Sequence, residues 1–295
     1  MHAWILLVVI SQVLQAIVVL LDKVLVSDKQ VKSPLVYAFY ASIMSGFVIV
    51  LVPFLPVQLP DPKTILLSLA SAVAYLIAIW SLYHIFKESS TIESMPMVSA
   101  VTALSTILIS AFAFSSPLKT SFFIGSLLLV FGSFLIARYA SNHMAILLVL
   151  VSGISFASSS IFMKMLFEHT DFVDGFVWSR IANVLVALLL LLIPQGVKTI
   201  KQVSKSASTK TVGLVVFNKF LAGVVFLMYL AAINMGDVSV VNALSGLQFA
   251  FLFIFAWFFA EHIPQYFRHE LTHRGVVRDV IAVAFIIIGF TILFI

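Results

Sequence analysis

The sequence predicts an all-α membrane protein that crosses the bilayer ten times. Of its 295 residues, 62% are hydrophobic and 10% are charged, whereas soluble domains are roughly 45–50% apolar and about 25% charged. Segments such as 186–193 are apolar on every side, so they do not fit the strands of a barrel, which alternate in polarity. This composition excludes a soluble enzyme, a nucleic-acid-binding domain and a disordered chain, and the absence of cysteine excludes disulfides and thiolate ligands.

Ten apolar segments, each near the roughly 20 residues that a membrane-spanning helix needs, follow one another with short polar breaks. The expected spans are 3–26, 34–55, 64–86, 91–114, 120–138, 144–167, 175–193, 211–233, 238–260 and 276–295. The first segment lacks a basic region and is too long for a signal peptide, so we expect it to stay in the mature protein. Prolines mark the breaks, at Pro34, Pro53, Pro56, Pro60, Pro62, Pro117, Pro194 and Pro264.

The two halves of the chain, 1–140 and 141–295, align as a repeat of five spans each. With a shift of 141 residues Pro53 aligns with Pro194, and after the longer loop at 195–210 the shift becomes 148. Because five is an odd number, the second half is expected to be inverted in the membrane relative to the first. Inverted repeats of this kind build many alternating-access transporters.

The basic residues predict the orientation of the chain. Twelve of the 17 Lys and Arg residues lie in the loops after spans 1, 3, 5, 7 and 9, three lie on the opposite side, and two lie within spans. Since Lys and Arg mark cytoplasmic loops, both termini are expected outside. We therefore expect a multi-pass protein of the cytoplasmic membrane, in contact with lipids and without nucleic acid.

Two local patterns link this chain to a known family. The first span ends in VLLDKVLVS at 19–27, and IFMKMLFE at 161–168 echoes it. A turn with Gly236 and Asp237 precedes a helix of small residues that closes on Glu261. In these patterns and in its compact five-plus-five repeat the chain resembles the drug/metabolite transporter superfamily, and within it the EamA-type proteins of ten spans.

The resemblance implies a secondary active transporter that moves a small metabolite, such as an amino acid, a drug or another small solute, by alternating access. It implies neither enzyme activity nor a cofactor. A proton or sodium ion as the coupling ion, and a homodimer, are both compatible with it. No G-x-x-x-x-G-K-[ST] motif occurs in the sequence, so a nucleotide-driven motor is not expected.

The alternative interpretation is a non-transporting membrane protein, either a zinc metalloprotease or a scaffold. His269-Glu270-x-x-His273 matches the H-E-x-x-H pattern, which places two zinc-binding imidazoles on one face of a helix. Arg268 and Arg274 flank the motif, and their positive charges would oppose a bound dication. We therefore expect no metal site and no catalytic residue here.

Two cations inside predicted spans are candidates for binding substrate. Lys219 lies about nine residues into the eighth span, and Arg180 lies five residues into the seventh. A charged group at this depth costs at least ~2.5–3.5 kcal/mol, so each needs a partner or a function. For Lys219 the alternatives are an anionic substrate or a buried carboxylate of the protein. For Arg180 they are a substrate contact or a side chain that reaches the near interface.

Three further charged residues lie near the ends of predicted spans. Glu93 lies in the first turn of the fourth span, where it either stabilises the helix dipole or carries a proton. Lys23 and Lys164 are equivalent in the repeat and are either interfacial anchors or gating residues.

Neutral polar side chains complete the candidate site. Amides in lipid would lack hydrogen-bond partners, so they are expected to face protein or a central cavity. Asn242, Ser245 and Gln248 are spaced i, i+3 and i+6 along the expected ninth span. The other candidates are Gln15, Tyr40, Asn183, Asn218 and Tyr229.

Overall fold

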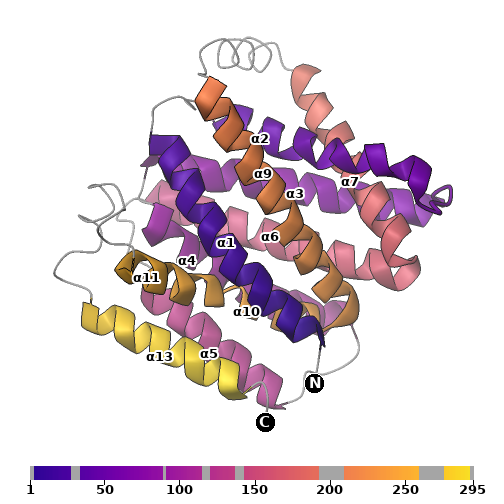
Figure 1. The fold of residues 1–295 in the computed structure, drawn as a ribbon. Helices are drawn as coiled ribbons and strands as arrows, with labels where there is room; N and C mark the ends of the chain where they lie inside the picture. The colour runs from indigo at the N-terminus through magenta and orange to yellow at the C-terminus, as the bar shows by residue number, and fades with distance from the viewer. Residues whose placement is uncertain are drawn as a thin grey trace.

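The computed structural model shows a bundle of helices (Figure 1). It describes residues 3–27, 34–88, 91–114, 120–136, 143–192, 209–258 and 276–292, and within these ranges no strand occurs. The segments are α1 (Ala3–Ser27), α2 (Pro34–Met44) continued by the 3-10 helix η1 (Ser45–Phe54), α3 (Pro62–Glu88), α4 (Thr91–Ala113), α5 (Thr120–Ile136), α6 (His143–His169), α7 (Phe172–Leu189) continued by η2 (Leu190–Leu192), α9 (Thr209–Met235), α10 (Val238–Leu244), α11 (Leu247–Phe258) and α13 (Val276–Ile292).

The helices agree with the predicted all-α membrane fold. Six of them, α1, α3, α4, α6, α7 and α9, contain segments that are long and apolar enough to cross a membrane. Shorter apolar helices occupy the other four expected spans among the described residues. The described helices thus cover all ten expected segments, while ten membrane crossings and the inverted repeat stay predictions.

The expected ninth span is broken into the two helices α10 and α11. The chain turns at Ser245 and Gly246 through hydrogen bonds between residues three apart. A Cβ on Gly246 would lie 2.4 Å from the Oγ of Ser133 on α5, so the break packs closely against that helix only with glycine. The spacing of Asn242 and Gln248 therefore does not run along one continuous helix, contrary to the prediction.

Helix α7 begins three residues before the predicted boundary. The Asp171 side chain accepts a hydrogen bond from the backbone N–H of Asp174 at 2.9 Å, which caps the helix, and α7 starts at Phe172. Hydropathy assigns these charged residues to a loop, whereas capping makes them part of the helix start. As a consequence, Arg180 is the ninth of 18 residues in α7.

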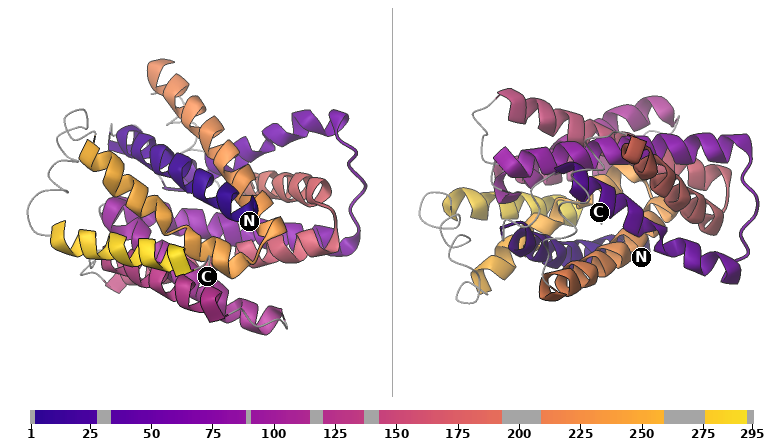
Figure 2. Two further views of the ribbon diagram at one scale, coloured as in Figure 1. Left: turned by 60° about the horizontal axis from the view of Figure 1, so that its bottom comes forward. Right: turned by 90° about the horizontal axis from the view of Figure 1, so that it is seen from above.

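Four helix pairs have the most extensive contacts in the bundle, and α4 with α6 is one of them. Helix α3 lies along α6, α1 lies along α9, and α5 lies along α13 (Figure 2). A Cβ on Gly132 would lie 2.7 Å from the carbonyl oxygen of Ala282, and one on Gly289 would lie 2.8 Å from that of Gly125. Small residues at these positions let the backbones of α5 and α13 approach, which is how helices associate in lipid.

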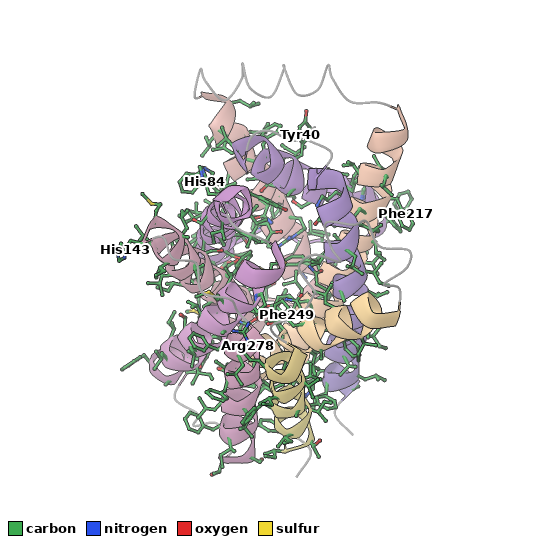
Figure 3. All side chains as sticks on the ribbon, turned by 90° about the vertical axis from the view of Figure 1, so that its left-hand side faces the viewer. Tyr40, His84, His143, Phe217, Phe249 and Arg278 are labelled. Carbon is green, nitrogen blue, oxygen red and sulfur yellow. The ribbon has the colours of Figure 1, made fainter. Side chains whose placement is uncertain are left out.

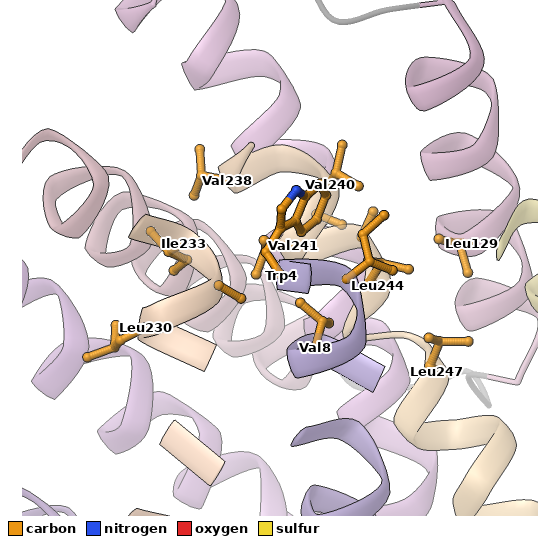
Figure 4. Close-up of a cluster of buried hydrophobic side chains, with 14 of the residues drawn as sticks. Trp4, Val8, Leu129, Leu230, Ile233, Val238, Val240, Val241, Leu244 and Leu247 are labelled. Atoms are coloured by element: carbon orange, nitrogen blue, oxygen red, sulfur yellow. The ribbon is translucent and has the colours of Figure 1, made fainter. Parts of the chain in front are cut away.

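The largest buried apolar cluster is formed mainly by residues of α1, α4, α5, α6, α9 and α10, and part of it is drawn in Figure 4. Val8 of α1, Leu230 of α9 and Leu244 of α10 are each at most 1% exposed. Close contact with Trp4 requires Gly236 in the α9–α10 turn, because a Cβ there would lie 2.6 Å from the indole ring. This cluster fixes the start of α10 beside α1 and positions the polar residues that α10 carries.

Candidate functional site

Arg180 lies in the interior of the bundle. Only 5% of its surface is exposed. At a rise of 1.5 Å per residue, it lies about 12 Å along the helix from the first residue of α7. Snorkelling of Arg180 to the near interface, one of the two predicted alternatives, does not agree with this depth and burial.

Among the described residues, no carboxylate contacts the Arg180 guanidinium. Within the described ranges, its Nε and Nη2 donate only to the Oγ of the neighbouring Ser179, at 3.3 and 3.4 Å, beyond the usual range of about 2.7–3.2 Å. A guanidinium carries five N–H donors, so most of them have no acceptor within the described structure. The cost of burying this cation, at least ~2.5–3.5 kcal/mol on insertion scales, is therefore not offset by an ion pair.

Aromatic rings from three helices surround the guanidinium. The Cζ atom of Arg180 lies 4.6 Å from the ring centroid of Phe226 on α9 and 5.9 Å from that of Phe176 on α7. Tyr75 of α3 packs against Phe226 with 5.7 Å between the ring centroids. Each cation–π contact contributes about 0.5–2 kcal/mol, which offsets part of the cost of burial.

Asn183 adds an unpaired hydrogen-bond donor one turn further along α7. It is 3% exposed, and its Nδ2 has no hydrogen-bond partner among the described residues. Residues three apart lie on the same side of a helix, so the amide donor and the cation share one face. The sequence placed these two residues together, and the structure buries both. The sequence did not identify Phe226 as a neighbour of Arg180, since phenylalanine occurs 28 times in the chain.

Tyr229 and Asn242 join a second polar group, made of neutral side chains. The hydroxyl of Tyr229 on α9 donates to the Oδ1 of Asn242 on α10, and the Asn242 Nδ2 donates to the hydroxyl of Thr106 on α4 at 2.7 Å. Ser160 of α6 lies 2.9 Å from the Tyr229 hydroxyl. Phe226 links this group to the Arg180 region, because its ring centroid lies 5.9 Å from that of Tyr229.

Lys219 forms an ion pair with Asp22 of α1. The Nζ of Lys219 lies 3.0 Å from the Oδ1 of Asp22, and their side chains are 12% and 22% exposed. Asn218 donates to the same oxygen at 2.8 Å and to the carbonyl of Val18 at 3.4 Å. Of the two predicted alternatives for Lys219, the structure shows the protein carboxylate. Asp22 was not predicted as the partner of Lys219, although it is the one acidic residue within the first predicted span.

Lys164 caps the end of α9. Its Nζ donates to the carbonyl oxygens of Asn234 at 3.3 Å and Gly236 at 3.0 Å. It also lies 3.8 Å from the Oε1 of Glu168 on its own helix. A cation next to the last carbonyls of a helix stabilises that end, so Lys164 holds α6 to the α9–α10 turn.

The segment between η1 and α3 is attached to α7. The backbone N–H of Gln58 donates to the Oδ1 of Asp174 at 2.9 Å, and the Nε1 of Trp178 donates to the carbonyl oxygen of Gln58 at 2.9 Å. Backbone groups supply one side of both contacts, so their strength depends little on which residue stands at 58.

A hydrogen bond between two exposed side chains lies next to this contact with α7. The Nε2 of His169 lies 2.8 Å from the Oδ2 of Asp61, and the backbone N–H of Thr64 donates to the Oδ1 of Asp61 at 2.9 Å. The hydrogen bonds from Thr64 and His169 hold the pKa of Asp61 well below its usual range. This carboxylate therefore stays charged at neutral pH.

The remaining candidates do not join the Arg180 region through any described contact. Gln15 is partly buried on α1, and Gln248 is 7% exposed on α11. Tyr40 is 38% exposed and lies at the outer edge of the bundle (Figure 3). The side chains of Lys23 and Glu93 lie outside the described part of the structure.

The H-E-x-x-H motif at residues 269–273 also lies outside the described residues. Within the described ranges, no group of three or more His, Asp or Glu side chains could hold a metal ion.

Comparison with known proteins agrees with this architecture. Residues 143–267 match the family model of the EamA-like transporter family, which belongs to the drug/metabolite transporter superfamily. This match confirms the resemblance read from the sequence. A solved structure titled "Crystal structure of protein" superimposes with a TM-score of 0.67 over 98% of both chains at 15% sequence identity, which shows a common fold. No curated protein matches the chain. The apolar helices and the family match together indicate a multi-pass membrane protein and a transporter of small solutes.

Proposed function

We propose that this chain is a secondary active transporter that moves a small metabolite across the cytoplasmic membrane by alternating access. In this proposal, residues 1–140 and 141–295 form two inverted five-helix repeats that rock against each other. The chain is not an enzyme and uses no cofactor. Both termini face outside, and energy comes from a proton or sodium gradient or from exchange of solutes.

The observation that carries the proposal is a row of hydroxyl and amide groups between α4 of the first half and α10 with its following turn in the second. Ser99 lies 2.7 Å from Ser245, and Ser110 lies 2.6 Å from Ser239, oxygen to oxygen. Thr106, between them on α4, bonds Asn242. Hydrogen bonds between neutral groups contribute only about 0.5–1.5 kcal/mol each. Water or a polar solute can therefore replace them as the halves separate.

The packing of the helices supports the repeat. In the proposed repeat, α1 corresponds to α6 and α3 corresponds to α9. The α3–α6 pair is therefore equivalent to the α9–α1 pair, and both pairs are in extensive contact. Helix α5 corresponds to α13 in the same repeat, and these two equivalent helices pack against each other. A transporter built from two equivalent halves can reach its two access states by exchanging their conformations.

Contacts between the halves at two places fit a gating role. In the proposed topology, the Asp22–Lys219 pair lies toward the cytoplasmic side, and the Gln58–Trp178 and Asp61–His169 contacts lie toward the opposite side. Alternating access requires one set to open while the other stays closed. Lys164 and Lys23 would then act near these two sides as gating residues.

The test is uptake into liposomes that contain the purified protein, with labelled amino acids and other small organic solutes. Uptake or exchange is measured with a proton gradient, with a sodium gradient and with neither. We expect saturable uptake of at least one solute, and we expect Asn242→Leu to abolish it. Thr291→Val is the matched control, because Thr291 is exposed on α13 and bonds only its own helix.

Absence of uptake and of exchange for every solute under all three conditions would contradict the proposal. Orientation is tested separately with a tag at either terminus. Labelling of a tag by a non-permeant reagent only after the cells are opened would contradict external termini. Cross-linking in native membranes tests for the homodimer.

A further inference from the structure

We propose that Arg180 and Asn183 bind the anionic group of an organic acid whose apolar or aromatic body lies against Phe226. This inference rests on the proposed transport function and deepens it, because it names the chemical class of the solute. It places the anion site at Arg180 on α7, whereas the sequence had suggested Lys219 for this role.

The state of hydrogen bonding at Arg180 gives the first step. Its guanidinium is buried, contacts no carboxylate among the described residues, and reaches only Ser179 at 3.3–3.4 Å. A carboxylate with two oxygens matches the planar fork of a guanidinium and satisfies two of its donors at once. The missing partner of Arg180 is therefore an anion of this shape.

Asn183 gives the second step. Its Nδ2 is buried, donates to no described acceptor, and lies on the same face of α7 as Arg180. An amide donor beside a guanidinium can bond another polar oxygen of the same solute. Two donors that lack acceptors on one helix face are unusual, because buried polar groups are nearly always paired.

The aromatic surroundings give the third step. Phe226 and Phe176 lie next to the cation, and Tyr75 packs against both Phe226 and Phe156. These rings come from α3, α6, α7 and α9, and among the described residues no acidic side chain contacts Arg180. A solute with a negative head and an apolar body fits these surroundings, whereas an organic cation would face Arg180 without a counter-charge.

The first experiment measures ligand-induced shifts in the melting temperature of the purified protein in detergent. The ligands are two matched pairs, phenylacetate with phenylacetamide and benzoate with benzamide. We expect the carboxylates, and not the amides, to stabilise the wild-type protein. In Arg180→Gln the apparent affinity for the carboxylates is expected to fall by at least tenfold, and in Arg180→Lys by less, because the charge remains and the fork is lost.

Lys63→Gln is the matched control, since it removes an exposed positive charge at the start of α3. It is expected to respond like the wild-type protein. An equal response of Arg180→Gln and wild type, an equal response to amides and carboxylates, or no response of the wild type to any carboxylate would each overturn the anion site. A response to phosphatidylglycerol alone, lost in Arg180→Gln, would assign the site to lipid and overturn the solute.

Uptake into liposomes separates this inference from the transport proposal. A protein that binds carboxylates through Arg180 without transporting them would keep the anion site and contradict the transport function. A protein that transports only neutral or cationic solutes, at the same rate in Arg180→Gln, would keep the transport function and contradict the anion site.

Discussion

Two buried cations of this protein have opposite surroundings. Lys219 on α9 lies 3.0 Å from Asp22, and Asn218 bonds the same carboxylate. Arg180 on α7 is more deeply buried, yet the described residues around it are aromatic rings and one serine hydroxyl. Asp22 balances the charge of Lys219 within the protein, whereas no described carboxylate balances the charge of Arg180.

This difference teaches that burial alone does not identify a binding residue. A charged group inside a membrane protein calls for an explanation, and a partner within the protein is one such explanation. The hydrogen bonds and counter-charge of Lys219 agree with a role in joining α1 to α9. The surroundings of Arg180 agree with a role in binding.

The largest expected change in the free energy of unfolding follows from substitution of Lys219. Lys219→Met removes the ammonium group that lies 3.0 Å from the Asp22 carboxylate inside the bundle. Because the side chains are 12% and 22% exposed, we expect the free energy of unfolding in mixed micelles to fall by about 2–3 kcal/mol, below the roughly 3–5 kcal/mol of a fully buried pair. The exchanged pair Asp22→Lys with Lys219→Asp should restore part of this loss, and no restoration would contradict the pairing.

The next effect concerns the neutral group beside Arg180. Tyr229→Phe leaves the Oδ1 of buried Asn242 without its described donor, and we expect a loss of about 1–3 kcal/mol in the same unfolding measurement. Ser160→Ala is the matched control, because it removes the Ser160 contact with the Tyr229 hydroxyl and leaves the Tyr229–Asn242 hydrogen bond in place. Equal losses for the two variants would show that Tyr229 does not stabilise the bundle through Asn242.

Arg180→Met is expected to change stability in the opposite direction. Methionine fills the space and removes a buried charge that has no described counter-ion, so the free energy of unfolding is expected to rise by about 1 kcal/mol. Transport of organic acids is expected to be lost at the same time. A loss of stability as large as that of Lys219→Met would remove the contrast between the two cations.

The smallest effect is expected at the exposed Asp61–His169 pair. The lowered pKa of Asp61 means that its contribution to stability is complete above the unfolded value of about 3.9 and decreases as the pH falls below it. Melting curves in detergent between about pH 3 and pH 6 should therefore be flatter for Asp61→Asn than for the wild-type protein. Glu168→Gln, which removes another exposed carboxylate, is expected to keep the wild-type profile.

Much of the helical architecture follows from the sequence because apolar length is a local property. The expected segments agree with the described helices to within a few residues, from α1 at Ala3–Ser27 to α13 at Val276–Ile292. The break at Gly246 was not predicted, and the close approach of Ser133 from α5 to this glycine is a contact between distant segments that no local pattern shows. The start of α7 was missed because the cap at Asp171 reads as a polar loop in hydropathy.

The sequence by itself determined that this chain is a helical membrane protein, and its local patterns pointed to the EamA-like family that residues 143–267 match. It also identified Lys219 and Arg180 as the cations that need explanation. Only the tertiary structure decided which of them has a partner, because Asp22 and Lys219 are 197 residues apart and meet through the packing of α1 on α9. The same packing brings Phe226, and Tyr75 that packs against it, to Arg180, since contacts between distant segments depend on the whole bundle and not on any local pattern.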